Sequence, residues 1–148
     1  MLPCASTAIP TYDSQCADAC KAPLHILIVD DFAPWRHLLR QVLALAGEVR
    51  VSEANDGLEA VQKARELNPD VILLDIELPH LNGIDAAKLI RAACPSSRII
   101  FLTASTQPSV LREALDTGAK GFVRKDRAGR ELWWAVQAVL HDRRFVSC

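Results

Sequence analysis

From Leu24 onward, five short apolar runs alternate with segments of helical periodicity. The runs cover residues 26–29, 49–54, 71–74, 99–102 and 122–123. Such alternation predicts an α/β fold in which helices cover both faces of a parallel sheet. Four runs are continuously apolar, which is typical of strands buried on both faces, whereas residues 49–54 include Arg50 and Ser52. We therefore expect residues 49–54 at an edge of the sheet.

The segments between the runs carry signals for helix ends. Asp56 with Glu59 three residues later matches a capping box, and Asn82 is a suitable N-cap. Pro108 suits a first helical turn, and Gly47 suits a left-handed C-cap. The clearest amphipathic stripe comes last and consists of Leu132, Ala135, Val136, Val139 and Leu140. These signals predict a helix after each strand.

Length and charge limit the domain count and the kinds of partner. With 148 residues, the chain has the size of one domain. Its 17 basic and 18 acidic residues nearly cancel, so no global basic field directs it to nucleic acid. No apolar run approaches the roughly 20 residues of a membrane span, and no charged leader precedes an apolar stretch. We expect a cytoplasmic protein without membrane contact.

Residues 1–22 show no sustained periodicity, which predicts a flexible N-terminal extension. The chain has five cysteines, an odd number, and none of them form a CxxC pair. This pattern argues against a zinc site and predicts reduced thiols, three of them in the extension. We expect the fold to need neither disulfides nor a structural metal.

Polar residues follow four of the apolar runs. Asp30 and Asp31 come after the first run, Asp75 after the third and Thr103 after the fourth, and Lys125 lies just beyond the fifth. In a right-handed parallel α/β sheet the carboxyl ends of the strands lie on one edge, where ligands bind. The sequence therefore predicts that these five residues share one pocket.

Three carboxylates in one pocket repel each other unless they take up a proton or bind a hard divalent cation through oxygen. Mg²⁺ is the natural candidate, because it binds few carboxylates and leaves positions open for phosphate oxygens. Asp75 stands alone at the end of the central apolar run, so we expect it to be the nucleophile. Asp30 and Asp31 would hold the metal, while Lys125 and Thr103 would neutralise a phosphoryl group. The expected product is an aspartyl phosphate.

Four segments in order carry a family resemblance: LHILIVDD, LLDIELPHLNG, FLTAS and GAKGFVRK. Together they resemble the receiver domain of bacterial two-component response regulators, and the resemblance covers residues 24–140. It implies a flavodoxin-like (βα)5 fold, a doubly wound parallel sheet with strand order 2-1-3-4-5. It also implies a phosphorelay role in which a sensor histidine kinase or phosphotransfer protein is the partner, and the receiver itself is not an enzyme.

The same resemblance assigns roles to single residues. It makes Asp75 the phosphoacceptor, Thr103 the switch hydroxyl and Lys125 the phosphate-binding lysine. It makes Phe122 the aromatic residue that turns inward when the hydroxyl moves. The Mg²⁺ ligands that it implies are Asp30, Asp31, Asp75 and the backbone carbonyl of Glu77. The chain departs from the common pattern after the lysine, where Asp126 replaces a frequent proline.

The usual output surface of such receivers is built from the helix that begins near Pro108, the strand at 122–123 and the last helix. It is a candidate homodimer interface. On the last helix, Trp134 lies nearly opposite the apolar stripe, so we expect it to face solvent or a protein partner. An exposed tryptophan on such a face indicates an interface residue.

The sequence analysis places the receiver domain at residues 23–142 and a short C-terminal tail at 143–148. Too few residues follow Leu140 for a helix-turn-helix output domain, so we expect no direct DNA binding. One alternative is a phosphatase or phosphotransferase of the haloacid-dehalogenase type, although Asp75-Ile76-Glu77 matches its two-aspartate motif poorly. The other is a receiver-like adaptor that is never phosphorylated, against which the complete acidic site argues.

Overall fold

The computed structural model describes residues 23–105 and 107–147. Six parallel strands form one sheet in the order β2-β1-β3-β4-β5-β6. The strands are β1 (Leu24–Val29), β2 (Val49–Ala54), β3 (Val71–Asp75), β4 (Arg98–Thr103), β5 (Gly121–Arg124) and β6 (Phe145–Val146). The first five positions confirm the predicted order. The extension predicted for residues 1–22, with three cysteines, lies outside the described residues, as does Cys148.

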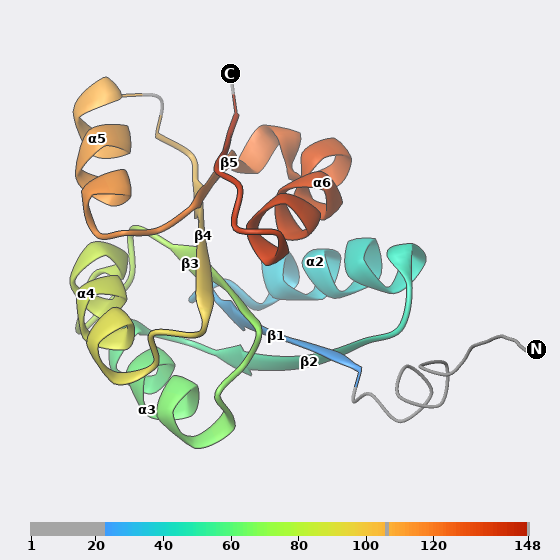
Figure 1. Ribbon diagram of the computed structural model, residues 1–148, viewed down its shortest axis with the longest axis horizontal. Coiled ribbons are helices and arrows are strands. Elements are labelled where there is room, and N and C mark those ends of the chain that lie inside the picture. The colour runs from blue at the N-terminus through green and yellow to red at the C-terminus, as the bar shows by residue number, and fades with distance from the viewer. Residues whose placement is uncertain (1–22, 106, 148) are drawn as a thin grey trace, which may run out of the picture.

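Five α-helices connect and cover the strands (Figure 1). They are α2 (Ala33–Ala46), α3 (Gly57–Leu67), α4 (Gly83–Ala93), α5 (Pro108–Asp116) and α6 (Ala128–Leu140), with a 3-10 turn η1 (Lys125–Arg127) before α6. Helices α2 and α6 lie on one side of the sheet, and α3, α4 and α5 lie on the other (Figure 1). No helix among the described residues is long and apolar enough to cross a membrane.

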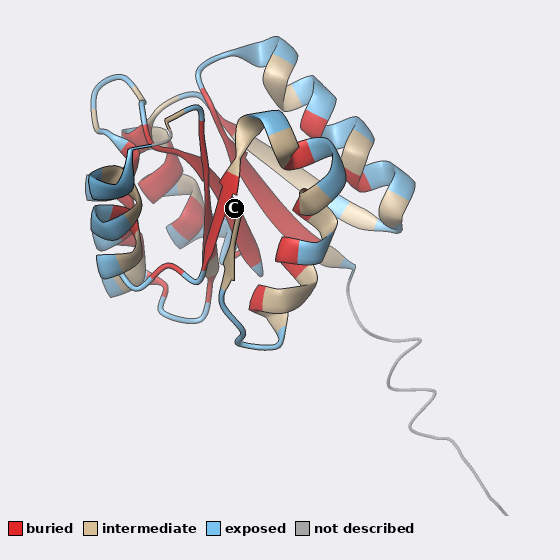
Figure 2. Ribbon diagram, turned by 90° about the horizontal axis from the view of Figure 1, so that it is seen from above, coloured by how far each residue is buried: buried red, intermediate tan, exposed pale blue. Residues whose placement is uncertain are grey.

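Alternating strand residues divide the core into two layers. Ile26 and Ile28 of β1 pack with α2 and α6, whereas Leu27 and Val29 pack with α3, α4 and α5. Because helices cover both faces, successive residues of β1, β3 and β4 are buried (Figure 2). This burial explains the continuously apolar runs in the sequence. The alternating run at residues 49–54 forms β2, which lies at the sheet edge as predicted.

The other edge of the sheet differs from the prediction. Residues 143–148 were expected to be a tail, but Phe145 and Val146 form β6, which pairs with Gly121 and Phe122 of β5. Phe145 packs into the layer of α2 and α6, and Val146 packs into the opposite layer. Two residues are too few to show the alternation of a strand, so β6 could not be predicted from the pattern of apolar residues.

Most of the predicted helix ends are confirmed. The Asp56 side chain accepts a hydrogen bond from the Glu59 amide at 2.8 Å, and the Asn82 side chain caps α4 in the same way. Pro108 is the first residue of α5. Gly47 is the C-cap of α2, but its backbone at φ 156° and ψ −166° is not left-handed helical; it has a positive φ that side-chain-bearing residues rarely adopt.

Candidate functional site

The carboxyl ends of β1, β3, β4 and β5 meet at one edge of the sheet, as their parallel pairing requires. Asp30 and Asp31 follow β1, Asp75 ends β3, Thr103 ends β4 and Lys125 follows β5. One ligand oxygen from each of the three aspartates lies within 4.8 Å of the others. The structure thus brings together the acidic residues that the sequence placed in one pocket.

Lys125 connects the two buried aspartates. Its Nζ donates to Asp30 Oδ2 at 2.7 Å and lies 3.4 Å from Asp75 Oδ2. Burial disfavours the charged ammonium, but the hydrogen bond to Asp30 and the negative charges of Asp75 and Asp30 outweigh it. The pKa of Lys125 is therefore raised above its ordinary value, and the residue is a cation at neutral pH.

Asp75 is almost completely buried, with 6% of its surface exposed. Burial is the main reason that its pKa is raised to about 6, and the charge of Asp30 adds to the effect. The charge of Lys125 and the Glu77 amide, 3.3 Å from Asp75 Oδ1, oppose the shift. Without a further cation, the surroundings of Asp75 therefore disfavour its charged form at neutral pH.

The donor set fits a hard divalent cation. Three carboxylates face one ammonium, and two of them, Asp30 and Asp75, are buried, so about two negative charges are left uncompensated. Asp31 is exposed, so the site can be reached from solvent. All of these ligand atoms are oxygens, which Mg²⁺ prefers. The backbone carbonyl of Glu77 stays a predicted ligand.

Thr103 is buried at the end of β4, beside Arg124 of β5. Its Oγ1 accepts a hydrogen bond of 2.9 Å from the amide of Ser105, so the hydroxyl holds the start of the loop between β4 and α5. Any movement of this hydroxyl would therefore move that loop.

Phe122 and Trp134 have opposite environments. Phe122 is buried, with 5% of its surface exposed, and lies in the same apolar cluster as Val146 of β6. Trp134 is 68% exposed on α6, which confirms the predicted orientation. Phe122 is thus buried in this structure, and its role as the aromatic switch residue stays a prediction.

Several contacts that hold the site were not predicted. The Phe32 amide donates to Asp30 Oδ1 at 2.9 Å, and Arg36 Nη1 donates to the Asp30 carbonyl at 2.6 Å. Arg36 also binds Glu53 at 2.6 Å, which ties α2 to β2. The only sequence signal for these contacts is that Phe32 and Arg36 come soon after Asp30, in the turn and in the first turn of the helix that follows it. Trp35 was also missed as part of the site, although its ring lies beneath the Lys125 ammonium.

Gly83 allows α4 to begin against the end of β3. Its amide donates to the Ile76 carbonyl at 2.8 Å, and a Cβ at this position would overlap the carbonyl oxygen of Asp75. Only glycine therefore fits without a shift of the backbone that carries Asp75.

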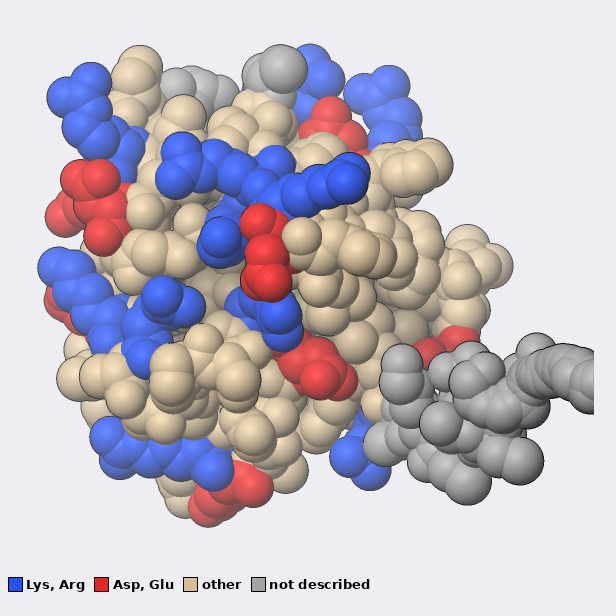
Figure 3. All heavy atoms as spheres, viewed as in Figure 1, with Lys and Arg blue, Asp and Glu red and all other residues tan. Residues whose placement is uncertain are grey.

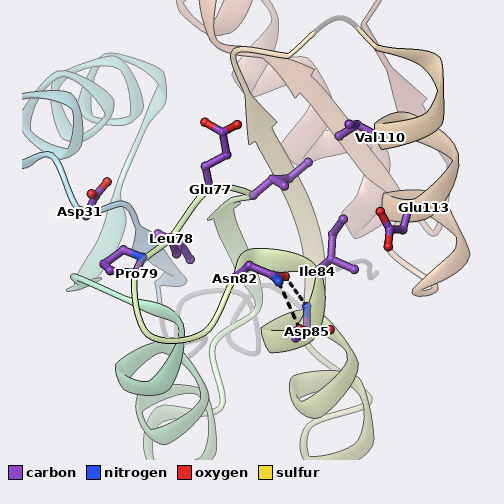
Figure 4. A pocket seen from close by; sticks show the side chains of 10 residues that line it. Asp31, Glu77, Leu78, Pro79, Asn82, Ile84, Asp85, Val110 and Glu113 are labelled. Atoms are coloured by element: carbon purple, nitrogen blue, oxygen red, sulfur yellow. Dashed lines mark hydrogen bonds between the residues drawn. The ribbon is translucent and has the colours of Figure 1, made fainter.

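A cleft of 570 Å³ opens beside the acidic residues (Figure 4). Asp31 and Glu77 line it from the loops after β1 and β3, and Glu113 lines it from α5. Asn82 and Asp85 are joined by hydrogen bonds at the start of α4 (Figure 4). Of the three clustered aspartates, Asp31 lines this cleft, whereas Asp30 and Asp75 do not.

The model of the response regulator receiver domain family matches residues 26–137, about three quarters of the chain. The chain belongs to this family. Among curated proteins, it is 43% identical over 100 residues to the chemotaxis protein CheY of Thermotoga maritima, an alignment that covers 68% of this chain and 83% of CheY. It is 38% identical over 117 residues to the transcriptional regulatory protein LnrK of Bacillus subtilis. That alignment covers 78% of this chain but only 53% of LnrK.

Solved structures show the same fold. A LuxR-family two-component response regulator from Aurantimonas sp. SI85-9A1 superposes with a TM-score of 0.80 at 32% identity, covering 85% of this chain and 91% of that one. One chain of a CheX–CheY–BeF3–Mg complex structure from Borrelia burgdorferi superposes with a TM-score of 0.74 at 30% identity, covering 79% of this chain and 89% of that one. The family and the flavodoxin-like architecture are thereby established.

Proposed function

We propose that Asp75 is the phosphoacceptor of this receiver and that it takes a phosphoryl group from a sensor histidine kinase or a phosphotransfer protein. The observation that carries the proposal is the buried Asp75 carboxylate, which shares a lysine with Asp30 at the edge of the sheet. Family membership argues against the haloacid-dehalogenase alternative. The complete acidic cluster argues against a receiver-like adaptor without phosphorylation.

In the proposed step, a carboxylate oxygen of Asp75 forms a bond to phosphorus while the phosphorus–nitrogen bond of a phosphohistidine breaks. The imidazole leaves with the electron pair and takes up a proton. A bound Mg²⁺, held by Asp30, Asp31, Asp75 and the Glu77 carbonyl, would supply neutralisation of the phosphoryl charge. Lys125 supplies a second positive charge, and Thr103 supplies a directional donor, because its oxygen accepts from the Ser105 amide and its proton is left to donate.

The output of the proposed switch lies at α5, β5 and α6. Movement of Thr103 would shift the loop that leads into α5, and so bias this face between two states. Lys and Arg side chains are numerous on the face that carries these elements (Figure 3). The exposed Trp134 on α6 adds a large apolar side chain to this face. We place a downstream protein, or a second copy of the chain, on this face, and we place the chain in the cytoplasm as a signal transducer rather than an enzyme.

The test is labelling with a phosphorylated kinase or with phosphoramidate in the presence of Mg²⁺. We expect the wild-type chain to take up one phosphoryl group and Asp75→Asn to take up none. The exposed Asp116 provides the matched control, because Asp116→Asn removes one carboxylate far from the acidic cluster and should label normally. Labelling of Asp75→Asn at the wild-type rate would refute the assignment. Chelation of Mg²⁺ should reduce the labelling of both active proteins.

A further inference from the structure

We propose that Trp35 is a positioning residue for Lys125. The Lys125 Nζ lies 5.4 Å from the centroid of the Trp35 ring. This is within the distance of about 6 Å at which a cation is attracted to the face of an aromatic ring, and tryptophan offers the strongest attraction. The inference rests on the proposed function, because it concerns the lysine that would meet the incoming phosphoryl group.

The surroundings of Trp35 hold its ring in place. The residue lies in the first turn of α2, where its amide donates to the Phe32 carbonyl at 3.1 Å. Its side chain is partly buried against the core cluster of α2 and α6. The ring is therefore fixed by the fold, while the flexible lysine side chain adapts to it.

The buried indole nitrogen of Trp35 indicates that packing alone does not explain a tryptophan at this position. Trp35 Nε1 is buried and has no hydrogen-bond partner among residues 23–105 and 107–147. A buried donor without a partner destabilises the fold, and an apolar side chain such as leucine or phenylalanine carries no such donor. The property that distinguishes tryptophan from leucine at this place is the electron-rich face toward the ammonium.

The other two partners of Lys125 change during the proposed reaction. Asp75 would become an acyl phosphate, and Asp30 would share its charge with a bound cation. Both salt bridges, at 2.7 Å and 3.4 Å, therefore weaken when the site is loaded. The contact with Trp35 depends on neither carboxylate. Trp35 thus keeps the ammonium at the site, in position for the incoming phosphoryl oxygens, while the two carboxylates change.

The first experiment compares Trp35→Leu and Trp35→Phe with the wild-type chain, using phosphoramidate and saturating Mg²⁺. We expect Trp35→Leu to lower the maximal labelling rate roughly three- to tenfold, the range that loss of one cation–π contact gives. The Mg²⁺ concentration at half-maximal rate should change less than about twofold. Trp35→Phe, which keeps an aromatic face, should recover most of the rate.

Leu45→Ala is the matched control, since it removes an exposed apolar side chain from α2, the helix that carries Trp35. It should label at the wild-type rate. Urea unfolding of each variant separates a local effect from a loss of folded protein. Equal rates for Trp35→Leu and the wild type would overturn the inference, and so would equal losses in the leucine and phenylalanine variants.

A second measurement leaves Trp35 unchanged and so does not depend on the folding of its variants. The chain has three tryptophans, and Trp133→Phe with Trp134→Phe leaves Trp35 as the sole emitter. We expect its fluorescence intensity to change when Lys125→Met removes the ammonium from the ring. Identical emission spectra with and without the ammonium would overturn the inference.

The two readouts also separate this inference from the proposed function. If the wild-type chain takes up no phosphoryl group, the proposed function fails, and the fluorescence measurement alone decides whether Trp35 holds Lys125. If labelling occurs at Asp75 but is insensitive to Trp35→Leu, the proposed function stands and the role of Trp35 is refuted.

Discussion

At the scale of single residues, the central feature is a carboxylate held under conditions that disfavour its charge. Asp75 is buried beside Asp30, and one lysine serves both. The sequence predicted this group because each of its polar residues lies at, or just beyond, the end of an apolar run. It did not predict Trp35 beneath Lys125 or Arg36 on the Asp30 carbonyl, because these contacts depend on the rotation of α2 over the sheet.

The raised pKa of Asp75 predicts how stability changes with pH. In the unfolded chain this group has its ordinary pKa of 3.8, and in the folded chain its pKa is about 6. The folded state therefore binds more protons between these values, so this group's contribution to the free energy of unfolding falls as pH rises from about 4 to 6. The fall is on the order of 2–3 kcal/mol.

Urea unfolding between pH 4.5 and 7.5, without divalent cations, checks this prediction. Asp75→Asn should lack this component and should therefore gain stability relative to the wild type as pH rises. At pH 7.5, Mg²⁺ should stabilise the wild-type chain more than the variant. A constant difference between the two proteins across the pH range would contradict the prediction.

At the scale of elements, most boundaries follow from local signals. The side chains of Asp56 and Asn82 cap α3 and α4 as predicted, because a cap needs only neighbours three residues away. β2 was correctly placed at the edge from its alternating pattern. Gly47 ends α2 as predicted but is not left-handed helical, because the chain enters β2 after only one intervening residue. β6 was missed because its two residues are held by β5 rather than by a pattern of their own.

Two glycines at helix starts give opposite predictions for the same substitution. Gly83→Ala forces a Cβ against the Asp75 carbonyl and should destabilise the chain by roughly 1–3 kcal/mol. Gly129 in α6 is exposed, and a Cβ there meets no atom within 4 Å, so Gly129→Ala should stabilise by roughly 0.5–1 kcal/mol. Urea unfolding of both variants measures the signs. Gly83→Ala should also slow labelling of Asp75, whereas Gly129→Ala should not.

At the scale of the whole molecule, β6 joins the C-terminal segment to the face proposed for output. The Phe145 amide donates to the Lys120 carbonyl at 2.9 Å, and the Ser147 amide donates to the Phe122 carbonyl at 2.8 Å. The Ser147 hydroxyl also bonds the Arg124 amide and the Glu131 carboxylate, which links β5 to α6. β6 is the outermost strand at this edge of the sheet, so a partner that approaches the sheet at this edge meets β6 before β5.

Val146→Asp should release β6, because it places a charge in the apolar cluster that contains Phe122. We expect the Phe145 and Ser147 amides to exchange with solvent at least tenfold faster, with little change in β1 and β3. Hydrogen exchange followed by mass spectrometry or NMR measures the difference. Arg144→Ala, at an exposed neighbouring position, is the control and should leave the exchange rates as they are. Unchanged protection in Val146→Asp would show that β6 does not depend on this side chain.

The proposed acceptor site draws its parts from widely separated stretches of the chain. The bond between Lys125 and Asp30 joins residues 95 positions apart, and Asp75 stands on the strand between them. A nascent or partly unravelled polypeptide lacks this arrangement, since no short fragment contains both the carboxylates and the ammonium. The chain can therefore accept a phosphoryl group only after β5 has been synthesised and has joined the sheet, so incomplete chains are not phosphorylated.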